Sequence, residues 1–189
     1  MENPISWEDA NIPNEELSEG DLEKAEAMGK LPPMRFLGRC KSIYLKEAHL
    51  SNYTCYAANL KWEVIDLITI EGKTPTDEQK NMYEGRFVFD DVMLPHPDEK
   101  EGMRNRRRLI AKRCGLVNGA AKAIPTEAWR TGIIDKEAII TTERQPYKDK
   151  RTGEDKTNVK VAFSGYESAT GADNVPFDSG KPAALPDDI

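Results

Sequence analysis

A period of two in the placement of apolar residues sets the narrowest limits on the fold of this chain. In residues 56–70, YAANLKWEVIDLITI, the side chains of Leu60, Trp62 and Val64 fall on one face and the residues between them on the other. This period is that of a β-strand with one buried face. Strand-like alternation or composition recurs in residues 34–48, 85–94, 137–147 and 157–166. We expect Gly38 to mark a bulge in the first of these strands.

One segment has the period of a helix instead. At about 100° per residue, residues 102–115, GMRNRRRLIAKRCG, bring Met103, Ile110 and Cys114 onto one packing face. The expected end signals are Asp98 as N-cap, Glu101 as its capping-box partner and Gly115 after the last turn. A loop containing Trp129 follows, and Gly153 lies in the turn of the last hairpin.

The order of these elements is three strands, one helix and two strands. That order is typical of the OB-fold, a five-stranded Greek-key barrel with a helix between its third and fourth strands. The sequence therefore predicts an all-β domain of this kind over residues 34–167. Residues 1–33 are predicted to be an acidic, largely flexible extension, and residues 168–189 a disordered acidic tail.

Charge is unevenly distributed along the chain, whose net charge is −6. Residues 1–29 hold nine acids and one Lys, residues 30–165 hold 25 bases and 19 acids, and residues 166–189 hold five acids and one Lys. A basic middle lies between two acidic ends, so the sign of the predicted domain suits an acidic partner.

No feature of the sequence indicates secretion or a membrane. The N-terminal residues MENPISWEDA lack the basic start and apolar stretch of a signal peptide. No apolar run approaches the roughly 20 residues that span a bilayer. The cysteines, odd in number and irregularly spaced, are expected as reduced, buried thiols: Cys40, Cys55 and Cys114. We expect a soluble cytoplasmic protein, either a monomer or a homodimer.

The most conspicuous basic cluster lies on the predicted helix. Arg104, Arg108 and Lys112 follow one another at i, i+4 and i+8 and point away from the packing face, while Arg106 and Arg113 lie on its flank. A solvated helix face explains this row fully. The alternative is a contact of this row with a phosphate backbone. Such a contact would only support the main site, because the OB-fold binds nucleic acid mainly across its second and third strands and the flanking loops.

The better candidate site combines cations and aromatic rings near the first two strands and the last hairpin. Cations follow phosphates, and aromatic faces stack bases with little sequence preference. The candidate residues are Arg35, Arg39, Lys41, Tyr44, Lys46, Tyr53, Tyr56, Lys61, Arg86, Tyr147, Lys148, Lys150, Arg151 and Lys156. For the four tyrosines, stacking and plain packing are both open. Trp62, Phe87, Phe89 and Phe163 are expected in the core, because they lie in alternating strands.

A catalytic site is the reading that the sequence favours least. Asp90, Asp91, Asp98 and Glu99, with Lys100, have the residue types of a metal-dependent nuclease. Such a site needs acids that converge from adjacent strands, whereas Asp90 and Asp91 are consecutive and point to opposite faces. No phosphate-binding glycine loop, nucleophile elbow or dinucleotide fingerprint is present. We expect no catalysis, no metal and no cofactor.

Three segments, EGRFVFDDVML, GMRNRRRLIAKRCGL and QPYKDKRTGEDKTNVKVAFSGY, resemble phage-encoded single-stranded-DNA-binding proteins of the OB-fold type. The resemblance covers roughly residues 30–167. It implies a protein that coats single strands in replication or recombination and recruits partners, or regulates binding, through an acidic tail. The tail residues concerned are Phe177, Asp187, Asp188 and Ile189. In bacterial single-strand binders the tail ends in Pro-Phe, whereas here Pro176 and Phe177 are internal.

Two other functions remain open from the sequence. A barrel with basic patches also suits a protein-binding adaptor for acidic partners. RNA binding or strand annealing uses the same surface chemistry as coating.

Overall fold

A computed structural model describes residues 31–117, 123–149 and 151–170 of the chain. Its strands are β1 (Met34–His49), β2 (Thr54–Ile70), β3 (Phe87–Met93), β4 (Glu137–Lys148) and β5 (Asp155–Ser168). Its helices are α2 (Asp77–Tyr83), α3 (Glu101–Arg113) and the short turn η1 (Ala128–Gly132). All of them belong to one unit, which begins at Pro32. The five predicted strands and the helix after the third are confirmed, with strand ends that differ by one or two residues.

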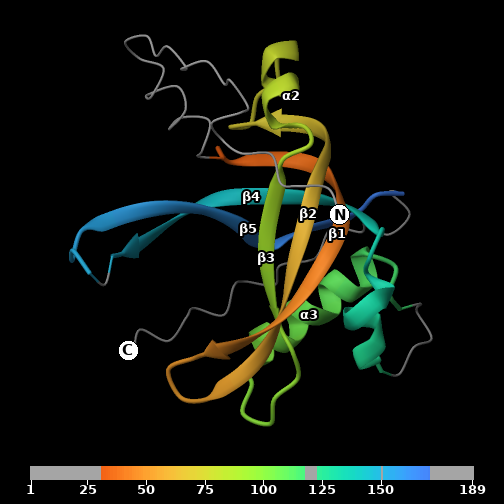
Figure 1. The fold of residues 1–189 in the computed structure, drawn as a ribbon, viewed down its shortest axis with the longest axis vertical. Coiled ribbons are helices and arrows are strands. Elements are labelled where there is room, and N and C mark those ends of the chain that lie inside the picture. Colours follow the sequence, from red (N-terminus) through yellow and green to blue (C-terminus); the bar gives the residue numbers. More distant parts are fainter. Residues whose placement is uncertain (1–30, 118–122, 150, 171–189) are drawn as a thin grey trace, which may run out of the picture. The chain divides into compact units, whose positions relative to one another are not determined.

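The strands form one antiparallel sheet in the order β3-β2-β1-β4-β5 (Figure 1). β1 and β2 pair along nearly their whole length, from Met34 opposite Ile70 to His49 opposite Thr54. β3 pairs with β2, β4 pairs with the first half of β1, and β5 pairs with β4. The chain is therefore mostly β, and β3 and β5 are the edge strands of the described sheet.

Gly38 interrupts the register of β1, as predicted. The pairing of β1 with β2 shifts between Leu37 and Gly38. A Cβ atom at Gly38 would lie 2.9 Å from Cε2 of Phe36 and 3.1 Å from Cδ1 of Ile140. Only glycine lets these two buried side chains approach the backbone of β1 so closely.

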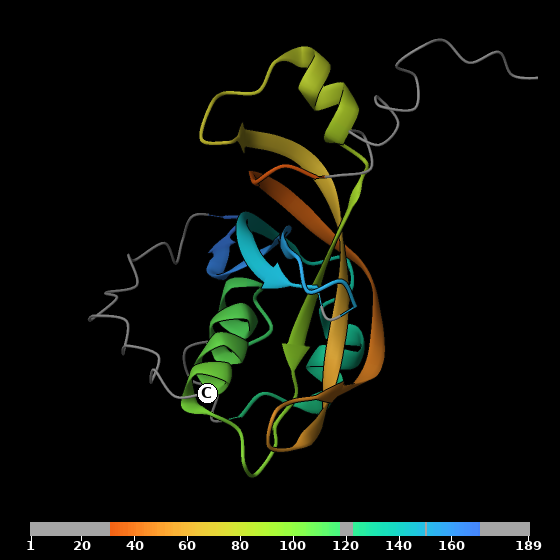
Figure 2. The same ribbon diagram turned by 90° about the vertical axis from the view of Figure 1, so that its left-hand side faces the viewer.

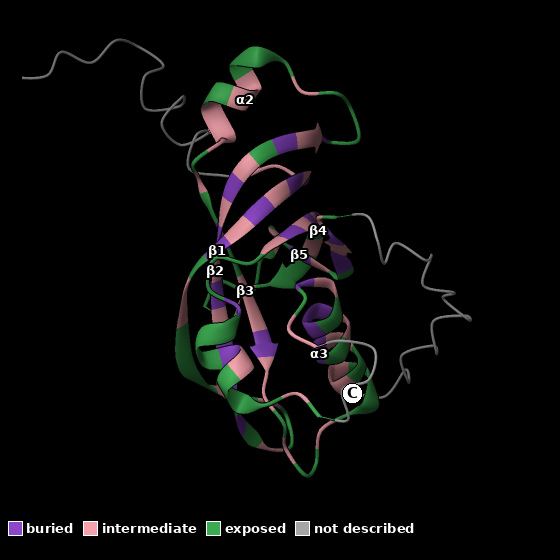
Figure 3. Cartoon of the chain, turned by 90° about the vertical axis from the view of Figure 1, so that its right-hand side faces the viewer, coloured by how far each residue is buried: buried purple, intermediate pink, exposed green. Residues whose placement is uncertain are grey.

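The core lies between the inner face of the sheet and α3. Buried residues alternate along the strands (Figure 3), and Leu60, Trp62 and Val64 of β2 are all inside, as predicted. The Trp62 ring packs edge-on against the ring of Tyr166, with centroids 5.8 Å apart. This pair joins the middle of the sheet to β5, at the far edge of the strand order.

Helix α3 packs against β3 and β5, the two edge strands (Figure 2). Its buried side includes Ile110 and Cys114, as predicted, whereas Met103 is only half-buried. The helix ends as expected at Gly115, which has φ of 65°. The N–H groups of Gly115 and Leu116 donate to carbonyl groups of the last helical turn, which is the Schellman arrangement.

The predicted start of α3 is wrong. The N-cap is Lys100, and no side chain hydrogen-bonds the first turn. Asp98 lies in the preceding turn, where its N–H donates to Nδ1 of His96 at 3.2 Å. The turn between β3 and α3 places Asp98 two residues before the helix, so Glu101 has no capping partner.

Two short helical elements lie where the sequence suggested none. α2 begins after Thr76, whose hydroxyl accepts from the N–H of Gln79 while the Gln79 side chain accepts from the N–H of Thr76. η1 replaces the predicted loop around Trp129, and the Trp129 ring is buried. The signal for α2 was present, because Thr-x-x-Gln is a capping-box spacing.

The three cysteines are free and buried, as expected. Burial raises the pKa of the Cys40 thiol to about 11 and also raises the pKa of Cys114. The predicted extensions, 1–33 and 168–189, lie almost wholly outside the described residues. So do Lys150 and the tail residues Phe177, Asp187, Asp188 and Ile189.

Candidate nucleic-acid interface

The face of β1, β2 and β3 turned away from the core carries four rows of side chains, which we call the outer face. The pairing register defines each row, because directly paired residues point to the same side of a sheet. The rows are Arg39 with Glu63 and Phe87, Ser42 with Lys61 and Phe89, Tyr44 with Asn59 and Asp91, and Lys46 with Ala57 and Met93.

Three aromatic rings on this face are open to solvent. Tyr44 is 56% exposed, Phe87 39% and Phe89 55%. The prediction that Phe87, Phe89 and Phe163 lie in the core is therefore wrong, since Phe163 of β5 is also 54% exposed. The register of β3 puts Val88 opposite Trp62 and Val92 opposite Ala58, on the buried face, so Phe87 and Phe89 point to the other side. Exposed rings on a soluble domain are candidates for contact with a ligand.

Lys61 lies among these rings. It pairs directly with Phe89 across the strands. Its Nζ lies 3.8 Å from the centroid of the Phe87 ring, which is a cation–π contact. Among the described residues no carboxylate forms an ion pair with Lys61. A cation next to exposed rings is the combination that holds a phosphate and its base.

The other cations of the outer face already hold carboxylates. Lys41 is paired with Glu63 at 3.6 Å, and Lys46 is paired with Asp91 at 2.6 Å. Asn59 donates to the same Asp91 carboxylate at 2.6 Å. Lys41 and Lys46, both predicted to bind phosphate, are therefore already paired with carboxylates.

Arg35 and Arg39, also predicted to bind phosphate, form ion pairs between strands. Arg35 donates twice to Glu167 of β5, at 2.9 and 2.8 Å, and Arg39 donates twice to Glu137 of β4, at 3.1 and 2.7 Å. The hydrogen bonds from Arg35 hold the pKa of Glu167 below its ordinary value. Arg39 thus joins β1 to its neighbour β4, and Arg35 joins β1 to β5, which lies beyond β4 in the sheet.

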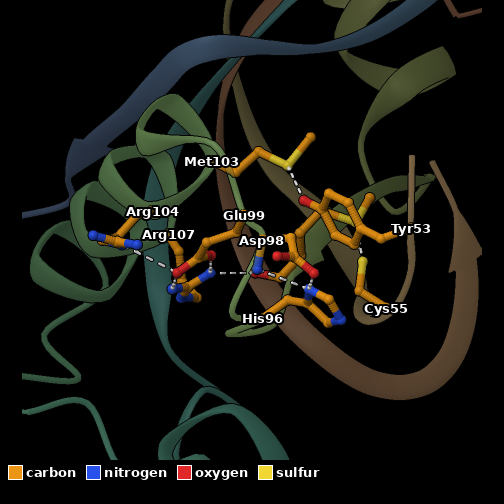
Figure 4. A network of polar contacts seen from close by, with 9 residues as sticks. Tyr53, Cys55, His96, Asp98, Glu99, Met103, Arg104 and Arg107 are labelled. Carbon is orange, nitrogen blue, oxygen red and sulfur yellow. Dashed lines mark hydrogen bonds and ion pairs between the residues drawn. The ribbon is translucent and has the colours of Figure 1, made fainter. Parts of the chain in front are cut away.

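The structure does not bring Tyr53 and Tyr56 to the outer face. Tyr53 stacks on His96, with centroids 4.5 Å apart, and its hydroxyl donates to Sδ of Met103 at 3.6 Å (Figure 4). Tyr56 lies in β2 opposite Glu47, where the register points it away from the outer face, and it is 59% exposed. Arg86, just before β3, lies with its guanidinium 6.0 Å from the ring of Tyr83.

The tip of the β4–β5 hairpin is organised around Asp149. Its carboxylate accepts from the N–H groups of Arg151 and Thr152 and is paired with Lys156 at 2.6 Å. The hydrogen bond from Lys156 lowers the pKa of Asp149. Tyr147 is exposed beside this turn. Within the described residues, Lys148 and Arg151 form no ion pair, so the tip presents cations to solvent.

The basic row of α3, Arg104 with Arg108 and Lys112, contains both unpaired and paired side chains. Arg108 and Lys112 are exposed and, within the described residues, form no ion pair. Arg104 instead donates to Glu99 at 3.1 Å (Figure 4). Arg107, which sequence reasoning did not single out, is buried and donates to both oxygens of Glu99, at 2.6 and 2.9 Å. These hydrogen bonds lower the pKa of Glu99.

Of the acidic residues considered for a nuclease site, Asp90, Asp91 and Glu99 are held by arginines or a lysine, whereas Asp98 lies 3.8 Å from Nδ1 of His96. Asp90 points inward, where it accepts from Arg106 at 2.9 and 2.8 Å and from the Tyr166 hydroxyl at 2.7 Å. Burial raises the pKa of Asp90, and Arg106 opposes that rise. Asp91 points to the outer face, so the predicted divergence of the two residues is confirmed. In the described part of the chain, no cluster of three metal-ligating residues exists.

Comparison with models of protein families and with curated proteins found no match to this chain. Within residues 31–117, 123–149 and 151–170, no helix has the length and apolar character needed to cross a bilayer.

Proposed function

We propose that this protein binds single-stranded DNA across the outer face of an OB-fold barrel, without an enzymatic step. Three features support the fold. The strand order is β3-β2-β1-β4-β5, α3 follows β3, and the edge strands β3 and β5 contact each other through the Tyr166 to Asp90 hydrogen bond. In the OB-fold, strands two and three and the adjacent loops bind oligonucleotides. The outer face lies on those strands.

The observation that carries the proposal is the set of three exposed rings around Lys61. Tyr44, Phe87 and Phe89 are large apolar rings that the described part of the chain leaves exposed on the outer face. Stacking of a base on such a ring contributes about 1–3 kcal/mol. Bases in a duplex are stacked on one another and are not accessible to these rings, so we expect a strong preference for single strands.

The ion pairs of the outer face make a second, independent prediction about salt. The logarithm of affinity for a single strand falls by about 0.7 for each phosphate neutralised per unit of log salt concentration. Four cations already form ion pairs with carboxylates: Arg35, Arg39, Lys41 and Lys46. A phosphate must displace a carboxylate before one of these cations can neutralise it. We expect a shallow salt dependence, dominated by stacking.

The test is fluorescence anisotropy of a labelled oligo-dT titrated with the full chain, beside a duplex of equal length and an RNA of equal length. Phe89→Ala is expected to weaken binding by about 5- to 150-fold, the loss of one stacked base. Phe163→Ala is the matched control, because Phe163 is an equally exposed ring, 54%, on β5 beside α3. Absence of binding, or equal losses for the two variants, contradicts the proposal.

The same titrations separate the competing functions. Tighter binding to the RNA assigns the site to RNA, and acceleration of the pairing of complementary strands adds an annealing role. Absence of nucleic-acid binding favours the alternative function, a protein-binding adaptor. If the acidic tail competes for the site or regulates it, removal of residues 171–189 tightens binding to oligo-dT, and unchanged affinity contradicts that role. By this proposal the protein coats single strands in DNA replication or recombination.

A further inference from the structure

We propose that Lys61 and Phe87 together bind one phosphate of the strand, while Phe89 stacks the neighbouring base; this inference rests on the proposed binding of single-stranded DNA. We call Lys61 with Phe87 the phosphate grip. Two adjacent phenylalanines of β3 thereby have different roles, although both are exposed on the same face.

The first argument is that the ammonium group of Lys61 already covers one face of the Phe87 ring. Nζ of Lys61 lies 3.8 Å from its centroid, so one face of that ring is covered by an ammonium group. A base cannot stack on a covered face. Phe87 is accordingly the less exposed of the two rings, at 39% against 55% for Phe89. The open ring of Phe89 is the one available to a base.

The second argument is register. Lys61 and Phe89 are directly opposite on β2 and β3, and such residues have Cβ atoms about 4.5–5.5 Å apart. A nucleotide whose base lies on Phe89 therefore has its own phosphate, or the next one, within the reach of the lysine side chain. Lysine is a flexible point charge with three donors, which suits a single phosphate oxygen group.

The third argument is charge. Lys41 and Lys46 of the same face are paired with Glu63 and Asp91. Lys61 has no carboxylate partner among the described residues, and the weak contact with Phe87 holds its flexible chain in place without neutralising it. Phe87 is thus a positioning residue, which acts on the strand through Lys61.

The experiment measures affinity for labelled oligo-dT at several salt concentrations for Lys61→Gln, Phe87→Leu, Phe89→Leu and the double variant of Lys61 and Phe87. An oligomer in which the bases are replaced by abasic sites is titrated in parallel. Lys80→Gln is the control, because Lys80 is a lysine of α2, outside the outer face, that is already paired with Asp66. Thermal unfolding of each variant confirms that the fold is kept.

We expect Lys61→Gln to reduce the magnitude of the salt slope by about 0.7, the loss of one phosphate contact. Phe87→Leu reduces the slope in the same direction and adds nothing in the Lys61→Gln background. Phe89→Leu weakens binding to oligo-dT with an unchanged slope and leaves binding to the abasic oligomer unchanged. Lys80→Gln leaves the slope unchanged.

Three results overturn the inference. Phe87→Leu that weakens binding at a constant slope makes Phe87 a second stacking ring. Additive effects of the Lys61 and Phe87 substitutions remove the coupling between them. A slope that changes as much for Lys80→Gln as for Lys61→Gln shows a general effect of charge and removes the specific role of Lys61. Failure of the proposed function is distinct from all three, since the unmodified protein then binds no oligo-dT and the inference falls with it.

Discussion

Replacement of Arg107 by methionine tests the buried ion pair that joins α3 to the turn before it. The side chains of Arg107 and Glu99 are each 6% exposed. The substitution removes two of the three hydrogen bonds that Glu99 accepts, and it leaves the carbonyl oxygen of Met93 without its 2.9 Å donor. Breaking a buried pair by removing one partner costs about 3–5 kcal/mol. Arg104 still donates to Glu99, so we expect the lower end, about 3 kcal/mol.

Urea unfolding of the full chain measures this free energy, and thermal unfolding gives a second reading. At about 2–4 °C for each kcal/mol in a chain of this size, the midpoint falls by about 6–12 °C. Arg108→Met is the control, because Arg108 is exposed on the next position of the helix and is expected to change stability by less than about 0.5 kcal/mol. Adding Glu99→Gln to Arg107→Met should recover part of the loss, since it removes the buried charge that only Arg104 still pairs. Equal effects of the two arginine substitutions, or no recovery, would refute the reasoning.

Three further predictions follow from the core and from the shifted pKa values. Gly38→Ala is expected to destabilise the protein by about 1–3 kcal/mol in urea unfolding, because its Cβ would lie 2.9 Å from Phe36; an unchanged midpoint contradicts the close approach. The hydrogen bonds from the neighbouring arginines lower the pKa of Glu99 below its ordinary 4.5, so the stability they contribute is present above that pH and is lost as the pH falls below it. Acid titration of stability should therefore be shallower for Glu99→Gln than for the unmodified chain. Burial raises the pKa of Cys40 to about 11 and that of Cys114 as well, so at pH 8 a disulfide reagent should label neither thiol until guanidinium unfolds the chain.

The strands of this fold were predictable because their information is local. A period of two along β2 identifies the buried set around Trp62 without knowledge of any partner strand. Gly38, Gly115 and Gly153 mark a bulge, a helix end and a hairpin turn through their own backbone geometry. The capping-box spacing that begins at Thr76 was also a local signal for α2. This helix was not predicted, because the apolar pattern there is too weak to suggest a helix.

The site was less predictable because its properties depend on pairing between distant segments. Arg35 and Glu167 are 132 residues apart in sequence, yet two hydrogen bonds join their side chains. No local pattern shows that this arginine is already occupied. For the same reason the exposure of Phe89 was missed. Its alternation with Val88 is compatible with either face inward, and only the pairing of β3 with β2, which puts Val88 opposite the buried Trp62, decides between them.

Two arginines of α3 also determine how the sheet meets other polypeptide chains. Arg106 and Arg107 donate to the carbonyl oxygens of Asp91 and Met93, on the edge of β3 that no strand covers. Such carbonyl groups are a template on which another chain can add a strand and begin aggregation. With α3 docked, guanidinium groups occupy that template. The docked helix therefore protects these two carbonyl groups of β3 from pairing with a strand of another chain.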